Sequence, residues 1–144
     1  MRLDAGIAGF TVLSLVVIGS ALSSPAAPAQ VANVARGKYL VEQVALCGDC
    51  HTPHNEKGEA VMAKGMKGAP LAFKPAVPIP IWADKAPNIA GLPGWEDDAA
   101  VKFFMSGIAY NDLPARPPMP QYRFNKPDAE AVVAYLKSLA PADK

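Results

Sequence analysis

The clearest pattern along the chain is an apolar stripe with helical spacing near the C-terminus. Four residues recur at positions i, i+3, i+4 and i+7: Val132, Tyr135, Leu136 and Leu139. This spacing places them on one face of an α-helix. Asn125 is suited to cap the helix, because Asp128 follows three residues later, and Pro141 is expected to stop it.

Two further helices are predicted upstream. The first spans about Asn33 to Leu46, with one apolar stripe formed by Gly37, Leu40, Val41 and Val44. The second begins at Trp95 or Glu96 and ends at Ser106, with Gly107 just beyond it. Acidic residues crowd its first turn, where the helix dipole favours negative charge. The chain is therefore expected to fold as an all-α domain.

Proline-rich loops connect these helices. Several prolines fall in the first loop, about residues 55–94, and in the second, from Pro114 to Pro127, so neither forms a long helix or an interior strand. A short extended run is expected at Val77 to Trp82. A loop as long as the first is usually functional or disordered, and its apolar content argues against disorder. We expect it to wrap around something apolar.

The first 29 residues resemble an export signal. Arg2 precedes an uncharged apolar run, residues 5–22, and Ala27-x-Ala29 provides a cleavage site before Gln30. The chain is therefore expected to be exported to the periplasm. An alternative is an uncleaved anchor through residues 5–22, which would tether the protein to the inner membrane, and a buried core helix is a third interpretation. Residues 30–144 form the single expected domain.

Composition excludes several classes of protein. The 144 residues carry 14 basic and 13 acidic side chains, a formal net charge of +1. An electrostatic nucleic-acid binder needs a strongly basic face, so no nucleic-acid partner is expected. The two cysteines lie within four residues of each other, so no disulfide framework can staple the domain.

The chemistry of the chain centres on Cys47-Gly48-Asp49-Cys50-His51, the C-x-x-C-H spacing of c-type haem attachment. Two thiols one helical turn apart can add to the two vinyl groups of one porphyrin. The imidazole of His51 then lies below the ring as an iron ligand. Three alternatives remain: a thioredoxin-like dithiol, a zinc site that recruits His54, and a simple disulfide between the two cysteines.

Met119 is the predicted second iron ligand. Prolines flank it on both sides in Pro117-Pro118-Met119-Pro120, which restricts the backbone of a loop that presents one side chain to a metal. An apolar loop contact is the alternative. Met62 and Met66 lie closer to the haem motif, and Met105 lies on a predicted helix, where a methionine is usually core filler. His54 is expected to be solvated or to lie beside a haem propionate, because its tether to His51 is too short for it to reach the opposite face of the ring.

These motifs together resemble the class I cytochromes c, and in particular the single-haem modules in cytochrome subunits of bacterial membrane-bound dehydrogenases. The resemblance covers residues 31–140. It rests on segments 36–40, 47–53, 86–89, 94–95, 118–120 and 133–139. The chain departs from that family at His54, where relatives usually have a basic residue, and at Ala90-Gly91, where an N-I-T-P stretch is common.

The resemblance implies a fold in which the first and last helices cross beside a haem c held by Cys47 and Cys50. Gly37 would allow the close approach and Tyr135 would pack on it. Trp95 would lie near a haem propionate or in the core. A backbone carbonyl, that of Pro70 or a neighbour, would hold the proximal His51.

The expected function is one-electron transfer, because His51 and Met119 leave the iron no open position for substrate. The protein would carry electrons from a dehydrogenase or quinol-oxidising complex to an acceptor oxidase or another cytochrome, and would not itself be an enzyme. The alternatives are a cytochrome subunit held tightly in a respiratory or photosynthetic complex, and a haem-based sensor or enzyme.

Overall fold

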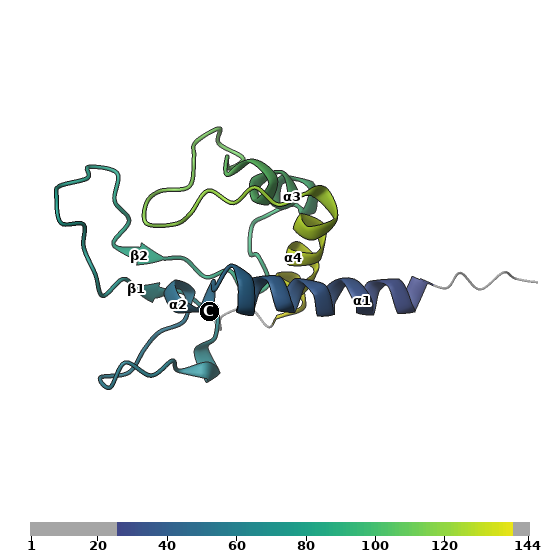
Figure 1. Cartoon of the computed structure of the whole chain (residues 1–144), viewed down its shortest axis with the longest axis horizontal. Coiled ribbons are helices and arrows are strands. Elements are labelled where there is room, and N and C mark those ends of the chain that lie inside the picture. Colours follow the sequence, from purple (N-terminus) through teal and green to yellow (C-terminus); the bar gives the residue numbers. More distant parts are fainter. Residues whose placement is uncertain (1–25, 140–144) are drawn as a thin grey trace, which may run out of the picture.

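The computed structural model describes residues 26–139, and these form a helical domain with extended loops (Figure 1). The elements in chain order are α1 (Ala26–Tyr39), a π-helical turn η1 (Leu40–Val44), α2 (Gly48–His51), a 3-10 turn η2 (Met62–Lys64), β1 (Ala69–Pro70), β2 (Lys85–Ala86), α3 (Asp97–Ser106) and α4 (Lys126–Ser138). The expected signal or anchor lies outside the described residues, except for Ala26–Ala29 at the start of α1. Among the described helices, none is long and apolar enough to cross a membrane.

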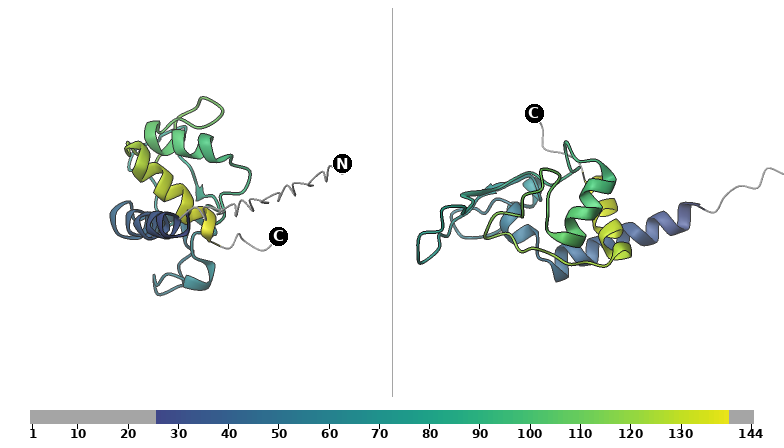
Figure 2. Two further views of the ribbon diagram at one scale, coloured as in Figure 1. Left: turned by 90° about the vertical axis from the view of Figure 1, so that its right-hand side faces the viewer. Right: turned by 90° about the horizontal axis from the view of Figure 1, so that it is seen from above.

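Helices α1 and α4 pack against each other, and α3 packs on α4 (Figures 1 and 2). The loops and the two short strands gather at the end of α1 that leads into α2 (Figure 1). Gly37 is buried where α1 meets α4, beside Ala131 and Tyr135. This is the close contact that the sequence led us to expect of Gly37.

The first helix differs from the prediction in its last turn. An uninterrupted helix to Leu46 would bury Val44, but the chain widens into η1, where the Ala45 N–H donates to the carbonyl of Leu40, five residues earlier. The extra residue in this turn rotates the succeeding residues about the helix axis. Val44 is consequently 51% exposed, and Ala45 packs against the core in its place.

The ends of α3 and α4 confirm the capping signals. Gly107 adopts a left-handed conformation with φ 74° immediately after α3, and its N–H donates to the carbonyl of Phe103. Asn125 accepts a 2.9 Å hydrogen bond from the backbone N–H of Asp128 at the start of α4. Helix α4 then buries Val132, Tyr135 and Leu136 of its apolar stripe, whereas Leu139 follows the helix and is partly buried.

The extended run expected at Val77 to Trp82 is wrong as a strand prediction. That segment consists of bends and a turn, in which the Trp82 N–H donates to the carbonyl of Ile79. Pro78 and Pro80 have no N–H to offer to a ladder. The two strands flank this segment instead, and they pair antiparallel with Ala69 opposite Ala86.

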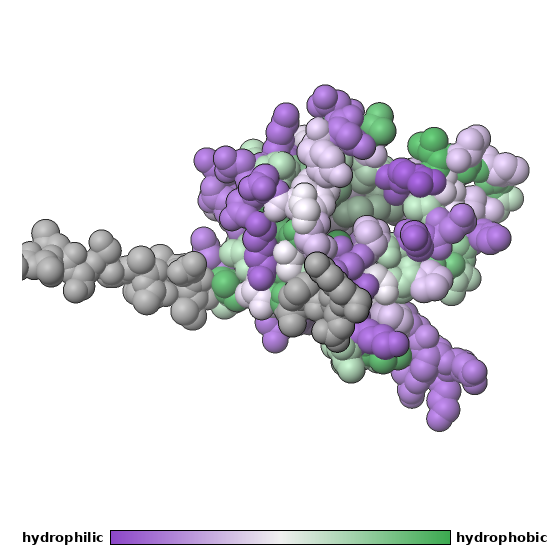
Figure 3. Space-filling view, turned by 180° about the vertical axis from the view of Figure 1, so that it is seen from behind, coloured by the Kyte–Doolittle hydropathy of each residue, from purple (hydrophilic) through white to green (hydrophobic). Residues whose placement is uncertain are grey.

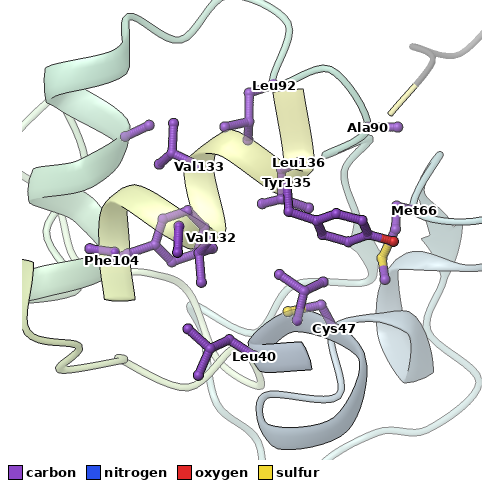
Figure 4. Packing of buried hydrophobic residues seen from close by; sticks show 14 residues of the cluster. Leu40, Cys47, Met66, Ala90, Leu92, Phe104, Val132, Val133, Tyr135 and Leu136 are labelled. Atoms are coloured by element: carbon purple, nitrogen blue, oxygen red, sulfur yellow. The ribbon is translucent and has the colours of Figure 1, made fainter. Parts of the chain in front are cut away.

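The hydrophobic core lies between α4 and the N-terminal elements (Figure 4). Leu40 and Cys47 face the apolar stripe of α4, and Phe104 reaches the same cluster from α3 (Figure 4). Cys47 is 9% exposed, so the haem-binding motif is built into the edge of the core. The position of the motif is therefore set by the packing of the helices.

Candidate functional site

Cys50 lies on the single helical turn α2, and Cys47 is the residue immediately before it. The segment turns sharply at Leu46, which has a positive φ of 50°, and the Cys47 N–H donates to the carbonyl of Val41. The His51 N–H then donates to the carbonyl of Cys47 over 2.9 Å. This turn places both thiols on the same side as the imidazole, as the motif requires.

The protonation of the two thiols argues against redox dithiol chemistry. Burial raises the pKa of Cys47 to about 11 and also raises the pKa of Cys50. A catalytic dithiol needs a lowered pKa, because the thiolate is the nucleophile. These neutral thiols therefore do not resemble the reactive pair of a thioredoxin.

The zinc alternative also lacks support in the structure. His54 is exposed and its backbone bridges to Ala60, on a loop that leads away from the motif. Within residues 26–139, no group of three or more His, Cys, Asp or Glu side chains is arranged to hold a metal ion. A tetrahedral site that uses His54 with the two cysteines is thus not formed.

His51 is held in one orientation by a backbone carbonyl. The side chain is 6% exposed, and its Nδ1 lies 2.7 Å from the carbonyl oxygen of Pro87. A carbonyl can only accept, so Nδ1 carries the proton and Nε2 keeps its lone pair for a metal. Burial lowers the pKa of His51, which keeps the ring neutral.

The carbonyl partner of His51 differs from the residue suggested by the sequence. Pro70 lies in β1, where it pairs with Lys85. Because β2 ends at Ala86, the next carbonyl, that of Pro87, is the one that meets His51. Pro87 lies 36 residues from His51, and no local sequence signal marks this contact.

One cavity brings the four predicted site residues together. Its volume is about 500 Å³, and its lining includes Cys47, Cys50, His51 and Met119. Of the other methionines in the described residues, Met62 is 77% exposed, Met66 is buried in the core, and Met105 lies on α3. None of these three lines the cavity.

Several lining residues were not predicted from the sequence. Tyr122 lines the cavity and donates a 2.8 Å hydrogen bond to the carbonyl of Ala45. Burial raises its pKa to about 12. Lys85 and Arg116 line the cavity as well, from two different parts of the chain. Neither residue belongs to a recognisable motif, so only the tertiary fold brings them to the cavity.

Trp95, by contrast, lies away from the cavity. Its ring packs 5.3 Å from that of Phe103 and 5.0 Å from that of Tyr110, measured between centroids. It is not among the lining residues. The structure therefore supports a packing role for Trp95 and not the contact with a propionate.

The donor set and the lining of the cavity fit a haem. Leu71, Phe73 and Pro118 supply apolar wall, and Lys85 and Arg116 bring positive charge that can balance the two propionates of a haem. The Nε1 of Trp82, whose ring packs edge-on against Phe73, is buried without a hydrogen-bond partner among the described residues. Thiols, imidazole and thioether thus share one apolar space with cationic groups.

Comparisons with known proteins also indicate a haem protein. The family model described as "Cytochrome c" matches residues 34–140. The cytochrome c subunit of the alcohol dehydrogenase (quinone) of Gluconacetobacter polyoxogenes is 32% identical over 127 residues, which cover 80% of this chain and 26% of that subunit. The fructose dehydrogenase cytochrome subunit of Gluconobacter japonicus is 31% identical over 114 residues, which cover 72% of this chain and 21% of the relative. The chain spans about a quarter of the length of these curated relatives.

Proposed function

Because the chain belongs to the cytochrome c family, we propose that it is an exported one-electron carrier in which His51 and Met119 are the axial ligands of a single haem. Members of the family carry covalently bound haem c, and Cys47 and Cys50 have the spacing that attachment requires. The chain is an electron-transfer protein and not an enzyme.

The observation that carries the axial assignment is the shared cavity. His51 and Met119 both line it, together with both cysteines. The haem supplies one-electron chemistry at its iron when bound. The chain holds the imidazole of His51 through Pro87, and it offers the neutral thioether of Met119 from the proline-rich loop. A thioether opposite an imidazole favours the reduced state.

The surroundings of the cavity support electron transfer without substrate binding. Two protein ligands leave no coordination position for a substrate, and apolar walls exclude water. Helices α1 and α4 would cross beside the haem, with Gly37 at their contact. Because these elements are packed into the core, the site geometry should change little between the oxidation states.

A dehydrogenase is the proposed electron donor. The relatives are named as cytochrome subunits of an alcohol dehydrogenase (quinone) and of a fructose dehydrogenase. We propose that this chain likewise accepts electrons from a dehydrogenase or quinol-oxidising complex and passes them to an oxidase or another cytochrome. The signal-like N-terminal residues support export to the periplasm, either in free form or tethered through residues 5–22.

A tightly held subunit of a larger complex is the second candidate. Exposed apolar side chains on the first proline-rich loop favour it, namely Phe73, Val77 and Ile81, which are 48%, 66% and 57% exposed. Hydrophobic residues are visible among hydrophilic ones on the surface in Figure 3. A partner that remains bound during purification at high salt would favour the subunit, whereas release at moderate salt would favour a mobile carrier.

Optical spectroscopy of the haem-loaded protein tests the axial assignment. We expect the ferric wild type to show a far-red sulfur-to-iron band and the ferrous form to resist CO. Met119→Ala should remove the band and open the iron to CO. Met105→Ala is the matched control, because Met105 does not line the cavity, and it should leave both properties unchanged. A Met119→Ala protein that keeps the band would contradict the assignment.

A further inference from the structure

The loop that carries Met119 is tied to two other segments, at points three residues before and three residues after the methionine. Arg116 donates from Nε to the carbonyl of Ile81 over 3.0 Å, and from Nη2 to the carbonyl of Trp82 over 2.7 Å. Tyr122 donates from its hydroxyl to the carbonyl of Ala45 over 2.8 Å. We propose that Arg116 and Tyr122 are positioning residues that keep Met119 at the iron, an inference that rests on the proposed axial ligation.

Arg116 ties the Met119 loop to the segment that precedes β2. A guanidinium is planar and offers several donors in a fixed fork, so a single side chain can hold two successive carbonyls. Among the described residues Arg116 forms no ion pair. The Ala83 N–H adds a 2.7 Å bond to the carbonyl of Pro117 in the same place. In each of these three hydrogen bonds, which hold the loop before Met119, the acceptor is a backbone carbonyl.

The backbone of Arg116 also shapes the turn that presents the methionine. Its carbonyl accepts a 3.1 Å hydrogen bond from the Met119 N–H. Pro117, Pro118 and Pro120 have no N–H and cannot donate outward from the backbone. The loop therefore depends on the side chains at its two ends for much of its attachment to the rest of the molecule.

Tyr122 ties the other end of the loop to the cysteine motif. Ala45 lies two residues before Cys47, and Tyr122 is half-buried at the cavity wall. Its ring stacks on that of Phe124 at 5.3 Å between centroids, which holds the hydroxyl in place. The bond to Ala45 therefore joins the segment that carries Met119 to the segment that carries the two thiols.

These ties bear on how often the methionine leaves the iron. A thioether is a single neutral ligand, and a loop can open locally while the core stays folded. A hydrogen bond contributes about 1 kcal/mol, so the loss of one raises the population of the open loop about fivefold. An open loop exposes the sixth position, and the rate at which CO binds the ferrous protein reports on that population.

The experiment compares Tyr122→Phe and Arg116→Gln with two matched controls. Tyr110→Phe alters an exposed tyrosine that packs edge-on against Trp95. Arg123→Gln alters an arginine whose hydrogen bonds within the described residues all go to the nearby Gln121 and Tyr122. We expect CO to bind about fivefold faster to Tyr122→Phe and about twenty-fivefold faster to Arg116→Gln, which loses two bonds. Both controls should bind CO at the wild-type rate.

A second readout separates positioning from a general loss of stability. The far-red band of the ferric variants should fade at a lower temperature than in the wild type, before the helical circular dichroism is lost. Arg116→Lys keeps the charge but loses the planar fork, so it should show most of the effect of Arg116→Gln. If Arg116→Gln does not load haem, Arg116→Lys and Tyr122→Phe carry the test.

The outcomes distinguish this inference from the axial assignment beneath it. Rapid CO binding by Met119→Ala, together with wild-type rates in Tyr122→Phe and in the Arg116 variants, would overturn the positioning role and leave the ligand assignment intact. A Met119→Ala protein that retains the far-red band would overturn the ligand assignment itself. Fading of the band only together with the helical signal would also count against positioning.

Discussion

Gly37 in α1 and Ala131 in α4 meet backbone to backbone. A Cβ atom at Gly37 would lie 1.9 Å from the carbonyl oxygen of Ala131, and 2.7 Å from the Cβ of Tyr135. Neither of these atoms belongs to the flexible end of a side chain. The separation of the two helices is therefore set by a residue that has no side chain.

Gly37→Ala should destabilise the folded protein, although alanine is the better helix former by about 1 kcal/mol. The overlap forces the helices apart, and we expect a net loss of about 2 kcal/mol in the free energy of unfolding. Urea unfolding of the haem-loaded protein measures this loss in free energy. Gly48→Ala is the control, because its Cβ would meet only ordinary contacts at 3.6 Å or more. Equal stabilities for the two variants would contradict the close packing.

Thr52→Val should weaken the connection between the haem motif and the loop that leads to Pro87. Thr52 is 3% exposed, and its hydroxyl accepts a 3.1 Å hydrogen bond from the Met66 N–H. Valine has nearly the same shape but leaves that buried N–H unpaired, which costs about 1–3 kcal/mol. Thermal unfolding provides the measurement. Thr52→Ser restores the hydroxyl and should recover much of the loss, whereas a serine variant no better than valine would argue against the bond.

Asn125→Ala should shorten or loosen the start of α4. The side chain of Asn125 accepts from the Asp128 N–H, and loss of such a cap costs about 1 kcal/mol. Denaturant unfolding should show this decrease. Asn125→Ser keeps a capping oxygen and is expected to remain close to the wild type. A serine variant as unstable as the alanine variant would show that capping is not the cause.

The ion pair between Arg36 and Asp128 joins α1 to the first turn of α4, with Nε 2.9 Å from Oδ1. The hydrogen bond from Arg36 holds the pKa of Asp128 below its usual value. A carboxyl whose pKa is lower in the folded state stabilises the fold above its unfolded pKa of about 4, and this contribution is lost as the pH falls through the folded pKa.

Asp128→Asn should therefore differ from the wild type near neutral pH and approach it in acid. The pair is exposed, so the difference in stability between the two proteins is small. It is measured best by determining the unfolding free energy of both proteins at about pH 6 and again at about pH 2. Asp112→Asn is the control, since Asp112 belongs to no ion pair among the described residues and asparagine tolerates its positive φ of 59°. A difference that does not vary with pH would contradict the role of the pair.

The end of α3, the start of α4 and the haem motif could be predicted because their signals are local. Asn125 caps α4 through a residue three positions away, and Gly107 ends α3 by its own left-handed conformation. Cys47 and Cys50 share one helical turn, so their relation depends only on the backbone between them. The prediction that Met119 is a ligand rested in the same way on the prolines beside it, without knowledge of distant segments.

The turn at η1 marks where this local reasoning failed. The spacing of Val44 fits an α-helical stripe, and no neighbouring residue indicates that Ala45 will take its place. The widened turn places Ala45 against the core and allows the Cys47 N–H to reach Val41. Tertiary packing therefore overrode the helical period in the segment that leads into the site.

The sequence by itself determined that three longer helices form, where α3 ends and α4 begins, and where the haem motif lies, because each depends on residues that are neighbours along the chain. Only the tertiary structure decided which distant groups contact His51 and the loop that carries Met119. Pro87 meets His51 across 36 residues, and Tyr122 meets Ala45 across 77. Proline-rich loops have no periodicity from which their path can be read, so the contacts they make appear only once the loops have folded around the cavity.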